Sequence, residues 1–291
     1  MNFLISGEKI QEIADIYLGY PEDFLWNPYI DRQKHKHKNI GEITSLYDNP
    51  RIVFCYTHCI DTLANIIHFF QNDFVLITHN SDENVEHDKR AAISQIVNCD
   101  KLVKWYTQNL CIQDISKVIF LPIGIANQQW EHGAHFRYFY ENLYIPNEAA
   151  YQKRKQEKSI YFFFEISTNK NKRQLCYDSL INKIPFLNKI SPMDNFNRLS
   201  DYEYCVCPEG NGVDTHRFWE ALYLKCVPIV IRNPLIDIIK NTTNLPMVIL
   251  NSWQDLEVNE LPRYDSFDFL NSANYLDLNF YKNIIHQSPM R

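Results

Sequence analysis

Short apolar runs alternate with amphipathic stretches along the chain from Arg51 onward. The runs RIVFCY and DFVLIT predict buried strands, and the stretches TLANIIHFF and KRAAISQIV predict helices. LVKWY and KVIFLPIG continue the pattern as two further strands. Alternation of strand and helix is typical of βαβ units, in which helices cover both faces of a parallel sheet.

A polar segment that favours helix, NEAAYQKRKQEK, interrupts this pattern near residue 150, and we interpret it as a domain boundary. Beyond it the pattern resumes with strands SIYFFFE, EYCVCP, VPIVI and MVIL and helices NKRQLCYDSLI, THRFWEALYL and LNFYKNIIH. The sequence therefore predicts an α/β protein with two Rossmann-like domains, 1–150 and 151–291. A ligand is expected in the cleft at the carboxyl ends of the strands.

The first fifty residues show less regularity. EKIQEIADIYL predicts a short helix, and the polar run DRQKHKHKN follows it. His35 and His37 alternate with lysines in that run. Because neighbouring positive charge opposes binding of a cation, a solvated loop is expected here and not a metal site.

Composition narrows the classes of function. The 291 residues carry a formal net charge of −6, so the chain is a poor candidate for binding nucleic acid, which needs a basic surface. Its N-terminal apolar run is short, and no stretch approaches the roughly 18 apolar residues of a membrane span. We expect a cytoplasmic protein without a transmembrane segment.

The eight cysteines lie mostly inside apolar runs and form no C-x-x-C pair, which argues against a zinc ribbon or a thioredoxin-like site. We expect them to be reduced thiols that pack like small apolar side chains. The run CYTHC brings Cys55, His58 and Cys59 together, but without a second Cys/His pair nearby it is weak support for zinc.

The most informative segment is CPEGNGVDTHRFWEALYLKCVPIVI, from Cys207 to Ile231. A strand ends at Pro208, a loop carries Gly210 and Gly212, and a helix begins after Asp214 or Thr215, either of which is a favourable N-cap. The helix is apolar on two faces, so it is expected to be packed between layers.

Basic residues occupy the first turn of this helix. His216 and Arg217 lie where the helix dipole is already positive, a position that normally favours acidic residues. An anion docked there, such as a diphosphate, explains them. Glu220 lies one turn deeper on the same face and is expected to accept hydrogen bonds from ribose hydroxyls. The alternative is an ion pair between Arg217 and Glu220 within the helix.

A second basic segment follows SIYFFFE, where the loop STNKNKR opens a helix. Lys172 or Arg173 is expected to hold the same diphosphate from the other side, and a solvated basic helix start is the alternative. No Asp-x-Asp triplet, a common divalent-metal motif of glycosyltransferases, occurs in the chain. We therefore expect no metal and no other cofactor, with the helix dipole, Arg and His in place of the cation.

The run YCVCPEGNGVDTHRFWEALYLKCVPIV resembles the exostosin-like and related fucosyltransferase-like GT-B glycosyltransferases. HNSDENV, LVKWYTQNL, LPIGIANQQWEHG and the spacing STN…KR…C are similar to these families as well, so the resemblance covers about residues 51–250. Cys226 departs from the pattern, since many relatives have Gly before or beside the VPIV strand.

The resemblance implies a nucleotide-sugar site on Glu209, Asp214, His216, Arg217 and Glu220, and transfer to an acceptor bound by the first domain. Together with the loop and the basic segment, the predicted donor-binding set is Glu209, Gly210, Asn211, Gly212, Asp214, Thr215, His216, Arg217, Glu220, Arg173 and Lys172.

The N-terminal half is expected to supply the base and to bind the acceptor. Asp82 follows the strand DFVLIT directly and is the preferred catalytic base; the alternative is that Ser81 or Asp82 caps the next helix. His79, Asn127 and Trp130 are expected to bind the acceptor sugar, because aromatic and amide groups suit carbohydrate. For the loop that carries Asn127 and Trp130, a packing or interdomain role is the alternative.

The sequence thus predicts a glycosyltransferase that moves a hexose or pentose from a nucleoside-diphosphate donor to a glycan acceptor. Inversion at the sugar is implied by the resemblance. Two alternatives stay open: a non-catalytic nucleotide- or glycan-binding protein of the same fold, and another α/β enzyme that handles phosphate.

Overall fold

The structure is a computed structural model that describes residues 3–45, 49–113, 115–144 and 159–289. The chain forms two compact units. The first unit comprises Asn2–Ile123, Asn127–Gln129 and Asp277–Arg291, and the second comprises Gly124–Ala126 and Trp130–Leu276. The boundary segment predicted from NEAAYQKRKQEK lies outside the described residues.

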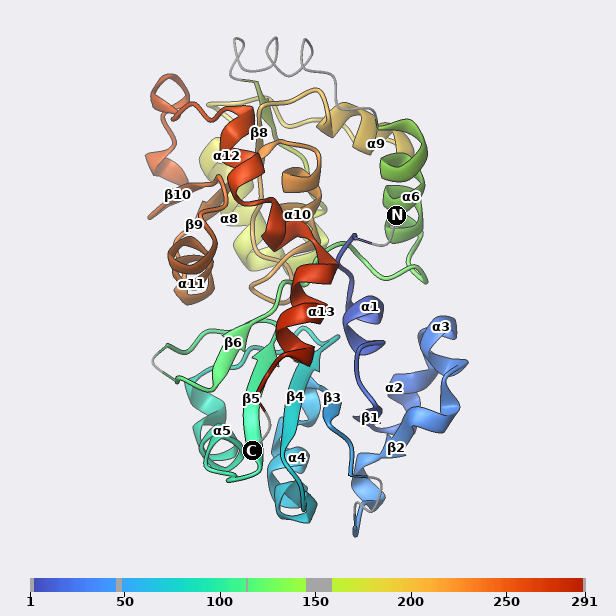
Figure 1. The fold of residues 1–291 in the computed structure, drawn as a ribbon. Helices are drawn as coiled ribbons and strands as arrows, with labels where there is room; N and C mark the ends of the chain where they lie inside the picture. Colours follow the sequence, from blue (N-terminus) through green and yellow to red (C-terminus); the bar gives the residue numbers. More distant parts are fainter. Residues whose placement is uncertain (1–2, 46–48, 114, 145–158, 290–291) are drawn as a thin grey trace. The chain divides into compact units, whose positions relative to one another are not determined.

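The sheet of the first unit is parallel throughout, with strand order β2-β1-β3-β4-β5-β6 (Figure 1). Its strands are β1 (Ile16–Gly19), β2 (His37–Asn39), β3 (Ile52–Tyr56), β4 (Phe74–His79), β5 (Leu102–Thr107) and β6 (Val118–Phe120). Every residue of β3 and β4 is buried, which is the expected consequence of a parallel sheet covered on both faces. The strands predicted over RIVFCY, DFVLIT, LVKWY and KVIFLPIG are confirmed as β3, β4, β5 and β6.

The helices of this unit are α1 (Gly7–Gln11), α2 (Pro21–Leu25), α3 (Pro28–Asp31), α4 (Ile60–Ile66), α5 (Arg90–Val97) and α13 (Leu278–His286). Helix α13 was expected in the C-terminal domain, yet it packs in the first unit. Its buried face carries Leu278, Tyr281 and Ile285, and its Ile284 carbonyl oxygen accepts a hydrogen bond from Tyr106 Oη at 3.0 Å. The apolar face predicts the helix but carries no information about its partner.

Two expectations for the first fifty residues were wrong. A helix was predicted over EKIQEIADIYL, but α1 ends at Gln11. The residues IYL at the end of that segment belong to the buried strand β1, which pairs with β2 and β3. Part of the expected solvated loop is strand β2, and the ring of His37 stacks on Phe24 with centroids 4.1 Å apart. Sheet pairing and this ring contact override the local polar pattern.

The second unit holds a four-stranded parallel sheet in the order β10-β9-β8-β7. Its strands are β7 (Ile160–Tyr161), β8 (Tyr204–Val206), β9 (Val227–Ile231) and β10 (Val248–Leu250). Its helices are α6 (Glu131–Tyr138), α8 (Lys170–Leu180), α9 (Pro192–Leu199), α10 (His216–Tyr223), α11 (Pro234–Thr243) and α12 (Ser266–Asn271). Both units thus confirm the α/β class, with two parallel sheets flanked by helices.

Helix α10 is buried on both of its apolar faces, as predicted. Phe218, Ala221 and Leu222 are buried on one side, and Trp219 and Tyr223 on the other. This packing fixes the orientation of α10, and with it the position of the loop that leads into the helix. The strand predicted over SIYFFFE is shorter than expected, because only Ile160 and Tyr161 pair with β8.

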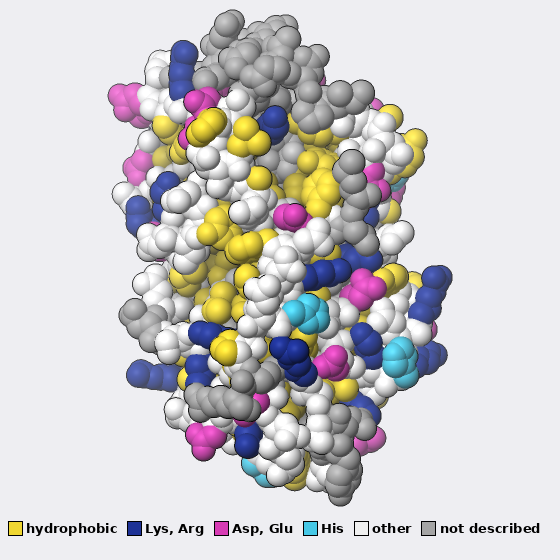
Figure 2. Space-filling view, viewed as in Figure 1, with side chains coloured by type: hydrophobic (Ala, Val, Ile, Leu, Met, Phe, Trp, Pro, Cys, Tyr) yellow, Lys and Arg dark blue, Asp and Glu magenta, His cyan; other side chains and the backbone are white. Residues whose placement is uncertain are grey.

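Charged side chains of both signs are interspersed on one face of the molecule. On the face drawn in Figure 2, Lys and Arg alternate with Asp and Glu and do not gather into a basic stripe. Among the helices that the structure describes, none has the length and apolar character needed to cross a membrane.

Candidate functional site

The segment between β8 and α10 borders a cavity of about 260 Å³ in the second unit. The cavity lies beyond the carboxyl ends of β9 and β10, where ligands of parallel α/β sheets bind. Helices α8 and α11 and the short 3₁₀ helix η8 (Trp253–Asp255) complete its wall. Four members of the predicted donor-binding set line it: Lys172, Glu209, Asp214 and Thr215.

The wall of this cavity combines apolar and polar groups. Phe218, Ile236, Ile239 and Trp253 are among its apolar residues, and Asn233, Asn251, Ser252 and Gln254 are among its polar ones. An apolar surface with a few polar groups is the common composition of small-molecule sites. It suits a flat ring that is buried on one side and hydrogen-bonded at its edge.

The loop that follows β8 is held from α8. Lys172 forms an ion pair with Glu209, and Asn233 Nδ2 donates to the same carboxylate at 2.8 Å. Arg173 Nε donates to the Glu209 carbonyl oxygen at 3.0 Å, and Asn169 Nδ2 donates to that of Gly210 at 2.6 Å. The side chains at the basic start of α8 are therefore not only solvated, because they fix this loop.

Arg217 is engaged by protein groups. Its Nε lies 3.1 Å from Glu220 Oε2, and its Nη1 donates to the Phe163 carbonyl oxygen at 3.3 Å. The guanidinium also lies over the ring of Tyr161, 5.4 Å from the centroid. Glu220 is buried, with 4% of its side chain exposed, and neither residue lines the cavity. The structure thus has the intrahelical ion pair that the sequence left as the alternative.

Two guanidinium groups influence each other beside this loop. Burial and then the positive charge of Arg217 lower the pKa of Arg173. Burial would also lower the pKa of Arg217, but the Glu220 carboxylate, together with Tyr161 and the nearby thiols, raises it overall. Since Glu220 neutralises only one of the two cations, an anion bound near both would relieve their repulsion.

Asp214, Thr215 and His216 connect the loop to α10. Asp214 Oδ1 accepts from the buried Trp219 indole at 2.8 Å, and Thr215 is the N-cap of the helix, without a side-chain capping bond. His216 Nδ1 lies 2.8 Å from the carbonyl oxygen of Gly124, whose φ is 65°. Gly212 is buried and Asn211 is exposed in the same loop. These contacts orient the first turn of α10.

The predicted acceptor residues are divided between the two units. His79 is fully buried in the first unit: its Nδ1 accepts from Asn80 N at 2.8 Å and its Nε2 donates to the Pro122 carbonyl oxygen at 3.1 Å. Asn80 Oδ1 accepts from Asn127 Nδ2 at 3.3 Å and lies 3.4 Å from His79 Nδ1, so the structure brings His79 and Asn127 together through Asn80. Trp130 is exposed in the second unit.

Asp82 is exposed just beyond the end of β4. Neither Ser81 nor Asp82 caps the next α-helix, because the N-cap of α5 is Lys89. Ser81 Oγ instead accepts from the Glu83 amide at 3.2 Å within the turn. Lys89 pairs with Glu83 a short distance along the chain.

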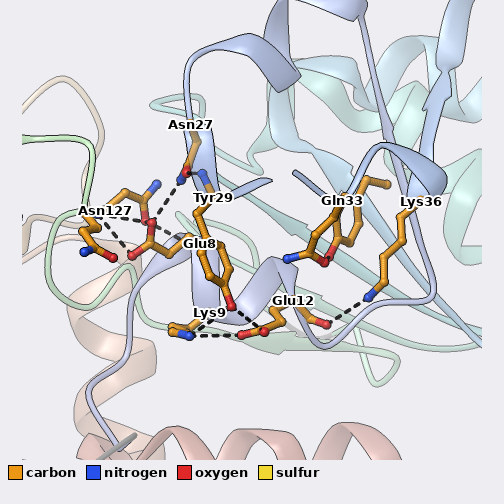
Figure 3. A network of polar contacts seen from close by, with 10 residues as sticks. Glu8, Lys9, Glu12, Asn27, Tyr29, Gln33, Lys36 and Asn127 are labelled. Atoms are coloured by element: carbon orange, nitrogen blue, oxygen red, sulfur yellow. Dashed lines mark hydrogen bonds and ion pairs between the residues drawn. The ribbon is translucent and has the colours of Figure 1, made fainter. Parts of the chain in front are cut away.

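Sequence reasoning missed a buried polar network around α1 (Figure 3). Glu8 is buried, and its carboxylate accepts from Asn27 Nδ2 at 3.1 Å and from the Gln128 amide at 3.1 Å. Its own amide donates to Asn127 Oδ1 at 2.8 Å. The partners are far apart in the sequence, so no local spacing indicates the network. It holds Asn127 in position.

A cluster of metal-ligating residue types also lies in the first unit. Among the described residues, Asp23, His58 and Cys59 form the group whose donor atoms lie within 4.8 Å of one another. Two of these residues belong to the CYTHC run, and Asp23, from α2, is the member that the sequence did not connect with it.

Neither a protein-family model nor a curated protein matches this sequence.

Proposed function

We propose that the protein is a nucleotide-sugar-dependent glycosyltransferase with a GT-B-like pair of domains, and that the donor binds in the cavity of the second unit. The observation that carries the proposal is the cavity itself. It lies at the carboxyl ends of β9 and β10 and is bordered by the loop of the motif that resembles these enzymes. Lys172, Glu209, Asp214 and Thr215 lie in its wall.

The chemistry of the wall supports a nucleotide. A base packs on the apolar side formed by Ile236, Ile239 and Trp253, where burial of a flat ring is favourable. The polar side chains of Asn233, Asn251 and Ser252 suit the edge of a base and the hydroxyls of a ribose.

The diphosphate is assigned to the side of the loop that faces the two arginines. An anion there relieves the repulsion between Arg173 and Arg217, and the N-terminus of α10 adds positive potential. The same positive charges stabilise the nucleoside diphosphate as it leaves the sugar, and they thereby take the place of a divalent cation. Glu220 keeps Arg217 in place and is not assigned to the ribose.

Asp82 is the proposed base. It takes the proton of the acceptor hydroxyl while that oxygen attacks the anomeric carbon and the bond to the diphosphate breaks, with inversion. Its exposure beyond β4 supports this role. His79 has both ring nitrogens engaged and is fully buried, so its proposed part is to hold the loop that leads to Asp82.

Ligand binding by a pair of matched variants tests the donor site. Leu175 lines the cavity and is 58% exposed, whereas Leu270 is 68% exposed in the same unit and is not in the cavity wall. Leu175→Trp is expected to weaken binding of UDP, GDP or ADP in calorimetry, and Leu270→Trp to leave it unchanged. Equal effects of the two variants would refute the site.

Turnover separates an enzyme from a binding protein. Incubation with nucleotide-sugars is expected to release nucleoside diphosphate, and faster when a glycan acceptor is present. Tight nucleotide binding without any release would favour the non-catalytic alternative.

A further inference from the structure

Three side chains with metal-binding atoms meet at one edge of the sheet in the first unit. Asp23 Oδ1 lies 3.1 Å from His58 Nε2, and Asp23 Oδ2 lies 3.9 Å from Cys59 Sγ. All three donor atoms lie within 4.8 Å of one another. Asp23 belongs to α2, just after β1, and the other two to the 3₁₀ helix η3 (Thr57–Cys59), just after β3.

The place of the cluster in the sheet favours a binding role. Strands β1 and β3 are parallel neighbours, and β2 lies on the other side of β1. The connection that follows β1 therefore leads to its neighbour β2 on one side, and the next strand, β3, lies on the other side of β1. Open α/β sheets bind ligands outside the carboxyl ends of the strands where the strand order reverses in this way.

The distances agree with the coordination of one ion. Tetrahedral zinc has Zn–N and Zn–O bonds of about 2.1 Å, which separates two such ligands by about 3.4 Å; with a Zn–S bond of about 2.3 Å, sulfur and oxygen are about 3.6 Å apart. The distances of 3.1 Å from His58 Nε2 to Asp23 Oδ1 and of 3.9 Å from Cys59 Sγ to Asp23 Oδ2 each lie within a few tenths of an ångström of these edges. Because they involve the two oxygens of one carboxylate, the Asp23 carboxylate must turn to offer one oxygen to an ion that both other ligands reach. Small side-chain adjustments therefore suffice to coordinate an ion.

The set of donors indicates which ions would bind. A thiolate with an imidazole and one carboxylate suits zinc and similar divalent transition metals, whereas magnesium and calcium require oxygen ligands.

The surroundings hold the ligands in place and leave one side open. Tyr20 N donates to Asp23 Oδ2 at 2.8 Å, and Tyr56 Oη donates to the Asp23 carbonyl oxygen at 3.1 Å. Such outer contacts orient metal ligands. Cys59 is 1% exposed, while the side chains of His58 and Asp23 are 31% and 13% exposed, so solvent reaches the cluster from the histidine side.

We propose that Asp23, His58 and Cys59 form a binding site for a zinc-class divalent ion, with the remaining coordination position available to water. The site lies in the first unit and is separate from the donor cavity. It does not depend on the proposed glycosyl transfer, because binding of the metal alone defines it.

Cobalt titration of the full chain tests the proposal. One equivalent of Co²⁺ is expected to produce a thiolate-to-cobalt charge-transfer band together with the visible bands of a tetrahedral ion, and Zn²⁺ is expected to displace it. Cys59→Ser should abolish the charge-transfer band, and His58→Ala should weaken cobalt affinity by at least about 100-fold, since loss of even an outer-shell partner costs 10–100-fold.

Matched variants serve as controls. Cys99→Ser removes a partly exposed cysteine of the same unit, and His68→Ala removes an exposed histidine one helix further along the chain. Both are expected to bind cobalt as the wild type does, with the fold of all variants checked by far-ultraviolet circular dichroism. The proposal fails if wild type gives no charge-transfer band, or if Cys59→Ser keeps it. A plain Asp23–His58 ion pair would give the first of these results.

Discussion

Arg217 Nε lies 3.1 Å from Glu220 Oε2 within helix α10, and the carboxylate of Glu220 is almost completely buried. A buried ion pair of this kind contributes little by itself, but removing one partner leaves a charge without compensation. Each residue therefore fixes the other, and the pair determines where the Arg217 guanidinium lies. This relationship makes Glu220 a positioning residue for the proposed phosphate site.

Glu220→Gln should weaken UDP and inorganic pyrophosphate binding by the same factor, because both depend on Arg217. The variant should also lose about 1.5–3 kcal/mol of unfolding free energy, because the Gln oxygen can still accept from Arg217 but the buried guanidinium loses the charge that compensates it. Calorimetry with both ligands and a urea titration measure this. Glu260→Gln, at an exposed position, is the control. A loss confined to UDP would instead assign Glu220 to the ribose.

Arg173→Gln should reduce affinity for a nucleoside diphosphate by about one to two decades, the loss of one charge-assisted contact. Lys170→Gln removes an exposed positive charge at the start of the same helix and is the matched control. Lys170→Gln should reduce the affinity only slightly, and this reduction should disappear at high salt. Equal losses in the two variants would mean that only the general field of α8 attracts the ligand.

Donor binding should not need a divalent cation. The dissociation constant for a nucleoside diphosphate is expected to be the same with EDTA as with magnesium or manganese, because Arg173, Arg217 and the α10 terminus supply the positive charge. Cys59→Ser should behave like the wild type in this assay, since the proposed zinc-class site lies in the other unit. Affinity that vanishes with chelator and returns with manganese would contradict the proposed phosphate site.

Asp82→Asn should lower kcat by about 100-fold or more, because a positioned base contributes 10²–10⁴-fold, while nucleoside-diphosphate affinity stays unchanged. Asp88→Asn alters another exposed carboxylate of the same region and should have normal kcat. A kcat for Asp82→Asn equal to that of the wild type would remove Asp82 from the reaction and leave the base to another carboxylate.

Gly7→Ala should destabilise the first unit. A Cβ at Gly7 would lie 1.7 Å from Asn80 Oδ1, so the contact between Asn80 and Asn127 must shift. Overpacking costs about 1–3 kcal/mol, which exceeds the gain of about 1 kcal/mol from better helix propensity in α1. At Gly41 the nearest atom would be 3.5 Å away, so Gly41→Ala should be near neutral in the same urea titration. Equal midpoints for both variants would show that Asn80 moves without cost.

The candidate sites differ in how much of them could be predicted. Gly210, Asp214 and Thr215 follow a strand and precede a helix in the sequence, so their place at the carboxyl end of a sheet could be inferred, and the structure has them there. The role of Glu220 could not be inferred. Spacing along a helix allows both a pair with Arg217 and a free carboxylate, and only burial and the Phe163 carbonyl favour the pair.

Local pattern alone was sufficient for the α/β class and for strands such as β3, β4 and β9, because a continuous apolar run reflects burial on both faces. It was insufficient for β1, where the apolar run Ile16–Leu18 fits a helix or a strand equally well and pairing with β2 and β3 decides. It also could not bring Asp23 to His58 or attach α13 to the first unit. The spacing of apolar residues along the chain indicates which residues are buried. It does not indicate which segment buries them, because that depends on packing between segments far apart in the sequence.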